Sequence, residues 1–229
     1  MTEEQTEIRR GLELVDAERR RRVADPKLAV AVDAIKRFQQ ERLATTYADL
    51  HAQPRYSAAV QFFLDELYGP GDFSRRDAEF ARIVPGLVKL FPRDVVATVR
   101  DVISLHALSE QLDTAMGSAL GERSPGDGTY GVVWREVGQP SRRHEQVDLS
   151  VRVGRAIQTY TRGVWMRRSL KLMRGPAQVA GLGALHSFLE RGFDAFAQMH
   201  GADYFLAQIS EREHAFASAM FAQSNLPRR

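Results

Sequence analysis

Apolar residues recur every three or four positions along most of the chain, the spacing that places side chains on one face of an α-helix. The clearest such stripe consists of Leu182, Leu185, Leu189, Phe193 and Phe196. Alternating apolar and polar residues, the pattern of a half-buried strand, continue nowhere for more than four positions. The pattern therefore predicts an all-α protein, a single globular bundle of about eight or nine helices.

Proline and glycine residues mark where helices should end. A long helix that begins at Pro26 should continue to Pro54. Gly175 and Pro176 should break a helix near residues 164–173, because proline lacks the N–H that a helix interior needs.

The amino-terminal segment has few apolar positions and a run of arginines from Arg19 to Arg22 that spreads charge around the helix. We expect residues 1–24 to form a polar, Arg-rich arm or helix that folding does not need. Residues 25–229 should form a single all-α domain, since a chain of this length supports one well-buried core. Within it, residues 121–129 are rich in Gly, Ser and Asp and should form a loop.

The run FFLDELYGPGDFSRRD at residues 62–77 predicts a helix end, a Gly-Pro-Gly turn and a new helix capped by Ser74 and Asp77. It resembles an uncharacterised family of bacterial proteins that continue through LHALSEQLD at 105–113 to MRGPA at 173–177. The resemblance extends from about residue 45 to residue 222 and implies a shared fold. Its distinctive runs are mostly turn, cap and packing residues, so it implies no reaction.

The composition restricts the chemistry that the chain can perform. There is no cysteine, which excludes disulfides, thiolate catalysis and Cys-based metal sites. The amino terminus is acidic and polar, unlike a secretory signal, and no apolar run approaches a membrane span, so we expect a cytoplasmic protein. The formal net charge of +3 disfavours nucleic acid as a partner.

The strongest candidate site comprises His106, Glu110 and Asp113, which share one helix face at positions i, i+4 and i+7. These side chains could hold iron, another divalent metal or haem. Glu211 and His214 add the Glu-x-x-His spacing of di-iron bundles, although those bundles use two such pairs and only one is present. The alternative, which we favour, is a structural His106 that bonds Glu110 across one turn, with no cofactor.

A basic cluster on the expected helix near 164–173 consists of Arg162, Arg167, Arg168, Lys171 and Arg174. Cations beside Trp165 could contact nucleic acid or anionic lipid. The low net charge favours a solvated face instead, with arginine stems over Trp165.

The sequence thus favours a non-enzymatic, cytoplasmic, helical binding or regulatory domain whose partner is another protein or a second copy. A metal- or haem-binding protein centred on His106 and a nucleic-acid contact through residues 162–174 are the alternatives. The chain has no phosphate loop and no nucleophile elbow, which disfavours nucleotide binding and serine hydrolase chemistry.

Overall fold

The structure is a computed structural model that describes residues 3–67, 73–90, 92–161 and 163–222, with the backbone alone at residues 85, 87–90, 127 and 164–167. These residues form eleven α-helices, one π-helical turn and no strand. In chain order they are α1 (Glu3–Ala24), α2 (Pro26–Thr46), α3 (Ala48–His51), α4 (Pro54–Phe62), η1 (Phe63–Leu67), α5 (Ser74–Leu90), α6 (Arg93–Leu120), α7 (Asp127–Val137), α8 (Pro140–Thr161), α9 (Val164–Val179), α10 (Gly183–Gln198) and α11 (Asp203–Ala222). The all-α prediction is confirmed.

The predicted number of eight or nine helices is too low. The long helix expected between Pro26 and Pro54 is divided, because Tyr47 leaves helical geometry with φ −109° and ψ 16°, and α3 starts after it. The predicted turn at residues 69–71 lies outside the described residues, but α5 begins at Ser74 as predicted.

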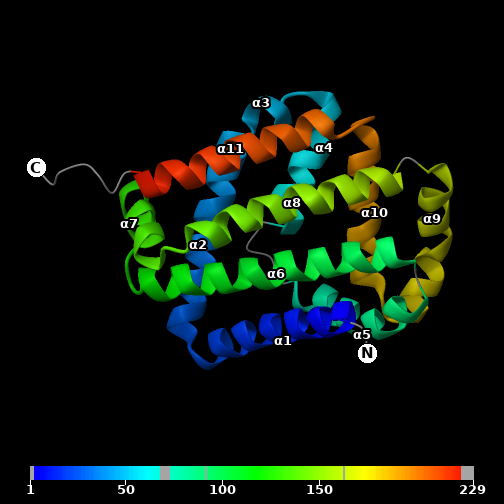
Figure 1. Ribbon diagram of the computed structural model, residues 1–229, viewed down its shortest axis with the longest axis horizontal. Coiled ribbons are helices and arrows are strands. Elements are labelled where there is room, and N and C mark those ends of the chain that lie inside the picture. Colours follow the sequence, from blue (N-terminus) through cyan, green and yellow to red (C-terminus); the bar gives the residue numbers. More distant parts are fainter. Residues whose placement is uncertain (1–2, 68–72, 91, 162, 223–229) are drawn as a thin grey trace, which may run out of the picture.

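The long helices form two crossed layers (Figure 1). Helices α1, α6, α8 and α11 lie side by side in one layer, with α8 running opposite to α6 and α11 opposite to α8. Helices α2, α4 and α10 cross behind them, and α2 packs on α6 and α1. At one end of the molecule α7 contacts α6 and α11, and at the other end α9 packs on α10 and α8.

Local sequence explains where α2 starts. The Asp25 carboxylate accepts hydrogen bonds from the backbone N–H groups of Lys27 at 3.0 Å and Leu28 at 3.1 Å. Pro26 occupies the first turn, where a backbone N–H would have no hydrogen-bond partner within the helix, so its absence costs nothing. This cap fixes the corner between α1 and α2.

Residues 3–24 form a helix, one of the two alternatives expected for this segment, and the helix is not detached from the rest of the fold. It packs along α6, and Ile8, Gly11 and Val15 are buried at spacings of three and four. Gly11 lies against Ile103 so closely that a Cβ atom would overlap the isoleucine side chain. The stripe was missed because it contains a glycine and few aliphatic residues, so hydropathy alone understates it.

Pro176 does not end α9, contrary to the prediction. The helix continues through it to Val179, and the chain turns at Gly181, whose φ of +67° suits glycine. Pro176 offers no N–H to the carbonyl of Leu172, but Leu172 is exposed, so water can bond that carbonyl. The predicted loop at 121–129 is shorter than expected, because α7 already begins at Asp127.

Two buried clusters form most of the core. One joins the α2 to η1 region with α8, α10 and α11, and it includes Leu43, Phe205 and Ile209. The other joins α2, α6, α7 and α11, and it includes Tyr130 and Trp134. None of the described helices is long and apolar enough to span a membrane.

Candidate functional site

A cavity of about 40 Å³ lies inside the bundle, between α2, α7, α8 and α11. Its lining is formed by Gln39, Arg42, Tyr130, Trp134, Arg143, Gln146, Val147, Ser150, Ile209, Glu213, Phe216 and Ala217. A volume of this size holds a few waters or one small polar group. Gln39 and Gln146 are only half-buried, so the cavity reaches close to the surface.

Arg143 of α8 is the central residue of this cavity. It is only 3 % exposed, and its guanidinium carbon lies 3.8 Å from the centroid of the Trp134 ring. Arg143 forms no ion pair with any residue that the structure describes, and its Nε and Nη2 atoms have no hydrogen-bond partner. Burial lowers the pKa of Arg143, with Tyr130 and Asp113 opposing that shift. Because an arginine keeps its proton at any ordinary pH, a buried positive charge remains.

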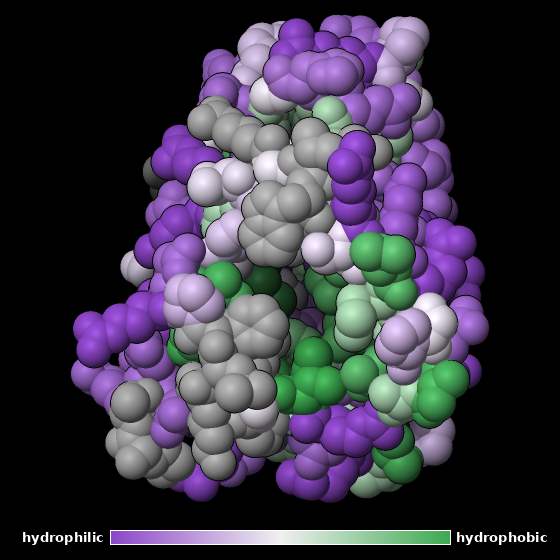
Figure 2. All heavy atoms as spheres, turned by 90° about the vertical axis from the view of Figure 1, so that its right-hand side faces the viewer, coloured by the Kyte–Doolittle hydropathy of each residue, from purple (hydrophilic) through white to green (hydrophobic). Residues whose placement is uncertain are grey.

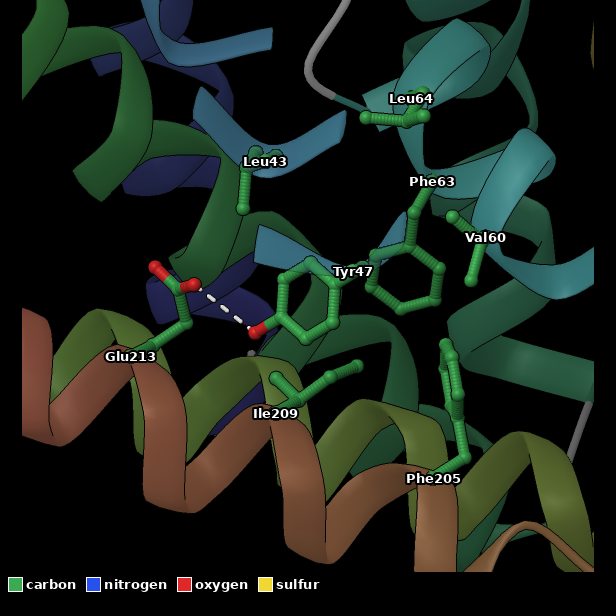
Figure 3. Close-up of a pocket in the computed structure, with 8 residues that line it drawn as sticks. All are labelled: Leu43, Tyr47, Val60, Phe63, Leu64, Phe205, Ile209 and Glu213. Atoms are coloured by element: carbon green, nitrogen blue, oxygen red, sulfur yellow. Dashed lines mark hydrogen bonds between the residues drawn. The ribbon is translucent and has the colours of Figure 1, made fainter. Parts of the chain in front are cut away.

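Arg42 of α2 is the second buried cation, and it is paired. Its Nη1 and Nη2 atoms donate to the two carboxylate oxygens of Glu213 at 3.0 and 2.7 Å. Glu213 also accepts a 2.9 Å hydrogen bond from the hydroxyl of Tyr47 (Figure 3). Burial opposes the charge of Arg42, but the bonds to Glu213 outweigh it and raise the pKa of Arg42. This pair leaves only the Nε of Arg42 without a partner.

Polar atoms that lack partners are concentrated at this cavity. Within the described part of the chain, five buried side-chain nitrogen or oxygen atoms have no hydrogen bond: Arg42 Nε, Tyr130 Oη, Trp134 Nε1, Arg143 Nε and Arg143 Nη2. All belong to residues of the cavity lining. Four are N–H donors, and burial raises the pKa of Tyr130 to about 12, so its hydroxyl also keeps a proton to donate. Buried donors without partners are rare in folded proteins, and these five favour a ligand rich in acceptor atoms.

Asp113 is an acidic residue whose charge acts on Arg143, but it is a weak counter-ion. Burial raises its pKa, and the opposing charge of Lys36 only partly offsets this. Its carboxylate accepts from Gln39 at 3.2 Å and lies 3.9 Å from the Lys36 nitrogen. The carboxylate is therefore directed toward α2, and the cavity retains an excess of positive charge.

A second, apolar cavity of about 20 Å³ adjoins the first and shares Ile209 and Glu213 with it. Figure 3 shows the rings of Tyr47, Phe63 and Phe205 and the side chains of Leu43, Val60 and Leu64 around it. This space is too small and too apolar to offer a binding site of its own.

Sequence reasoning missed this site, although one signal was present. Arg143 stands four residues before Val147, and the same helix face continues through Ser150, Gly154 and Gln158, which are buried. An arginine in register with a buried face indicates either a buried ion pair or a ligand contact. Trp134 and Tyr130 come from α7, whose first residues lie in the segment that was expected to be a loop.

The structure separates the members of the predicted metal site. His106 Nε2 lies 2.9 Å from the Asp77 carboxylate of α5, not against Glu110. Glu110 instead forms ion pairs with Arg22 and with Lys36, the latter at 3.0 Å. Burial would raise the pKa of Glu110, but the two positive charges outweigh it and lower that pKa to about 2. The described residues include no group of three His, Asp or Glu side chains placed to hold a metal ion.

Asp77 was expected to act in a helix cap, and it is the centre of an ion cluster. It contacts Arg19 of α1, and Arg76 Nε donates to it at 2.9 Å. Burial opposes its charge, but the hydrogen bond with His106 and the charges of Arg76 and Arg19 lower the pKa of Asp77. The cluster joins α1, α5 and α6.

Glu211 and His214 do not converge. Glu211 is exposed and accepts from Gln208 at 3.4 Å, whereas His214 stacks on His144 of α8 with 2.7 Å between their Nδ1 atoms. The other ring nitrogen of His214 lies 3.0 Å from Asp148.

The basic cluster is described only in part. Arg162 lies outside the described residues, as does the side chain of Arg167. Arg168 and Lys171 are exposed, and Arg174 forms an ion pair with Glu190 at 2.6 Å. The expected contact of arginine stems with Trp165 also lies outside the described side chains.

A family model described as a domain of unknown function, DUF8198, matches residues 18–227. This match confirms the predicted likeness to an uncharacterised family. Neither the curated proteins nor the solved structures include a significant match to the chain.

Proposed function

We propose that this chain, which belongs to the DUF8198 family, is a helical binding domain that holds a small oxyanion in the cavity between α2, α7, α8 and α11. The observation that carries the proposal is the buried guanidinium of Arg143, which has two N–H groups without partners and no ion pair among the described residues. A non-enzymatic binding or regulatory domain, the function that the sequence favours, agrees with such a site.

The physical reason is the cost of a buried charge. A charged group removed from water without a counter-ion destabilises a fold by several kcal/mol, so proteins pair such groups. The stacking on Trp134 recovers only part of this cost, about 2 kcal/mol for a desolvated cation. An anion beside Arg143 would supply the missing charge and accept the free hydrogen bonds.

The geometry of the donors favours a carboxylate or a phosphate group. The guanidinium presents parallel N–H groups that match two oxygens of one such group. The indole N–H of Trp134, the Nε of Arg42 and the hydroxyl of Tyr130 can complete its coordination. A cavity of about 40 Å³ accepts the head group of a small metabolite and excludes a large ligand.

The remaining polar side chains of the lining support binding over catalysis. Ser150 donates its hydroxyl to the carbonyl of Gln146 at 2.8 Å, and Glu213 is held by Arg42 and Tyr47. Neither is free to act as a nucleophile or a base.

The test is a thermal denaturation titration of the full chain with inorganic phosphate and with acetate, against chloride at equal ionic strength. A ligand at about one hundred times its Kd adds about 2.7 kcal/mol of stability, which raises Tm by about 5 to 10 °C in a chain of this size. We expect one of the two oxyanions to raise Tm in this way and chloride to have little effect. Equal shifts with all three salts would overturn the proposal.

Two substitutions locate the effect. Arg143→Met should abolish the response to the oxyanion, while Arg155→Met, an exposed arginine on the same helix, should keep it. If Arg143→Met fails to fold, isothermal titration of Trp134→Phe replaces it, and an oxyanion affinity equal to that of the wild type would contradict the site.

A further inference from the structure

We propose that the outer face of α9 docks this protein on a membrane surface that contains anionic lipid. This inference is independent of the oxyanion site, because it depends on exposed residues at the opposite end of α8 from Arg143. It rests on the charge of the segment, on its exposed aliphatic side chains and on its position in the fold.

The charge of the chain is strongly segregated. Residues 149–189 contain seven basic and no acidic residues. All 29 acidic residues and the other 25 basic residues lie elsewhere, so the low net charge of +3 conceals a positive segment. The mild net charge of the whole chain is therefore a poor guide to this region, and a local surface of one sign attracts surfaces of the other.

Apolar side chains of the positively charged helix α9 are exposed to solvent. Leu172 is 79 % exposed, Met173 is 53 % exposed and Val179 is 92 % exposed. Leu172 and Val179 are seven positions apart, which places them on one side of the helix. The inner side is occupied separately, because Ala177 is buried. The exposed face therefore has an apolar strip that the rest of the fold does not use.

Cations flank this apolar strip. Arg168 and Lys171 are exposed, and neither forms an ion pair with a residue in the described ranges. Arg82 of α5 donates to the carbonyls of Ala180 and Gly181 at 2.8 and 2.6 Å, which adds another guanidinium beside Val179. Hydrogen bonds to carbonyl groups do not neutralise Arg82, so a third positive charge lies at the carboxyl end of α9.

The position of α9 suits a flat surface. The helix forms the right-hand end of the molecule, outside α10, with no other helix beyond it (Figure 1). Viewed from that end, apolar side chains gather on the molecular surface next to strongly hydrophilic ones (Figure 2). A planar partner can therefore reach α9 without obstruction from the described helices.

An anionic bilayer fits these features better than nucleic acid or a second copy of the chain does. Nucleic acid would use the cations and leave Leu172 and Val179 in water. A second copy would bring two positive faces together. Interfacial helices combine Lys and Arg with aliphatic residues that enter the acyl boundary, as this face does, and each basic residue near an anionic leaflet favours binding.

The experiment is co-sedimentation of the full chain with vesicles of phosphatidylcholine alone and of equal parts phosphatidylcholine and phosphatidylglycerol. We expect binding to the acidic vesicles only, weaker at high salt. The double variant Arg168→Glu/Lys171→Glu should reduce the partition coefficient at least tenfold, at about one kcal/mol per basic residue. Wild type that sediments with neither vesicle, or equally with both, would overturn the proposal.

Matched controls test the apolar strip. Leu172→Ser/Val179→Ser should weaken vesicle binding several-fold, whereas Val23→Ser/Val30→Ser should not, although Val23 and Val30 are 84 % and 71 % exposed. If both double variants bind as the wild type does, the docking face is not α9. Arg143→Met should still bind vesicles, which separates this proposal from the interior site.

Discussion

The guanidinium carbon of Arg143 lies 3.8 Å from the ring centroid of Trp134, and both side chains retain N–H groups without partners. Helices α7 and α8 are joined by a short connection, so these two residues are brought face to face by a tight turn. The stacked pair lines the same cavity as the Arg42 to Glu213 ion pair. An interior with this excess of donors is better suited to an anion than to an apolar ligand.

Trp134→Phe should weaken oxyanion binding without abolishing it. Phenylalanine keeps an aromatic face for Arg143 but removes the indole N–H, and one such hydrogen bond is worth about 0.5 to 1.5 kcal/mol, or about twofold to tenfold in Kd. Isothermal titration with the oxyanion that raises Tm measures the change. Trp165→Phe serves as the control, and an equal loss in both variants would show that Trp134 does not face the ligand.

Acid should destabilise the protein through Glu110 and Asp77. Their folded-state pKa values are lowered, to about 2 for Glu110, so the stability they contribute is complete above their unfolded pKa values of about 4.3 for Glu110 and about 3.9 for Asp77. It is lost as pH falls from there toward about 2. Asp113 has a raised pKa and acts in the opposite sense, favouring folding below its unfolded pKa. Urea denaturation across this acidic range measures the slope.

Glu110→Gln tests the assignment of that slope. The variant should lose about 3 kcal/mol at neutral pH, because Arg22 and Lys36 keep their charges without a carboxylate. Its stability should also vary less with pH below about 4.3. An unchanged acid slope would show that other carboxyl groups dominate acid unfolding.

Gly117→Ala should destabilise the contact between α2 and α6. A Cβ atom there would lie 2.5 Å from Cγ2 of Val32 and 3.0 Å from its backbone nitrogen, so the helices would have to separate. Overpacking of this kind costs about 1 to 3 kcal/mol. Gly86→Ala, a helical glycine with nothing within 4 Å of the new Cβ, should instead gain up to about 1 kcal/mol. Chemical denaturation of both variants is the measurement, and equal effects would contradict the close crossing.

Removal of residues 1–24 should lower Tm, in contrast to what the sequence alone predicts. Ile8 and Val15 are buried against α6, and Arg22 pairs with Glu110, so deletion exposes apolar surface and leaves a buried carboxylate with one partner fewer. A melting curve of the truncated chain checks this. A Tm equal to that of the full chain would show that α1 contributes little to folding.

His106→Gln should be tolerated with a modest loss of stability, because glutamine can still donate a hydrogen bond to Asp77. Elemental analysis and an absorption spectrum of both proteins give the second readout. Stoichiometric iron, manganese or zinc, or a Soret band, that is present in the wild type and absent in the variant would establish the metal or haem alternative. Ser109→Ala is the control for local packing.

The sequence by itself determined the fold class and some boundaries of the helices, such as the starts at Pro26 and Ser74. Helical periodicity, the helix start at Pro26 and the restart at Ser74 are local signals, and each depends on residues only a few positions apart. The sequence also determined the positive charge of residues 149–189, which needs no fold to be counted. Pro176 shows the limit of local signals. It predicts a helix end, but α9 continues through it at a place where the chain is exposed to solvent.

Only the tertiary structure decided which polar residues meet. His106 and Glu110 do not pair with each other across one helical turn. His106 contacts Asp77, 29 positions away, and Glu110 contacts Arg22, 88 positions away. Arg143 is buried because α7, α8, α2 and α11 converge on it, and no pattern within α8 specifies that convergence. The reason is physical: the periodicity of a helix determines which face is buried, whereas the partner of a buried charge depends on how separate helices pack.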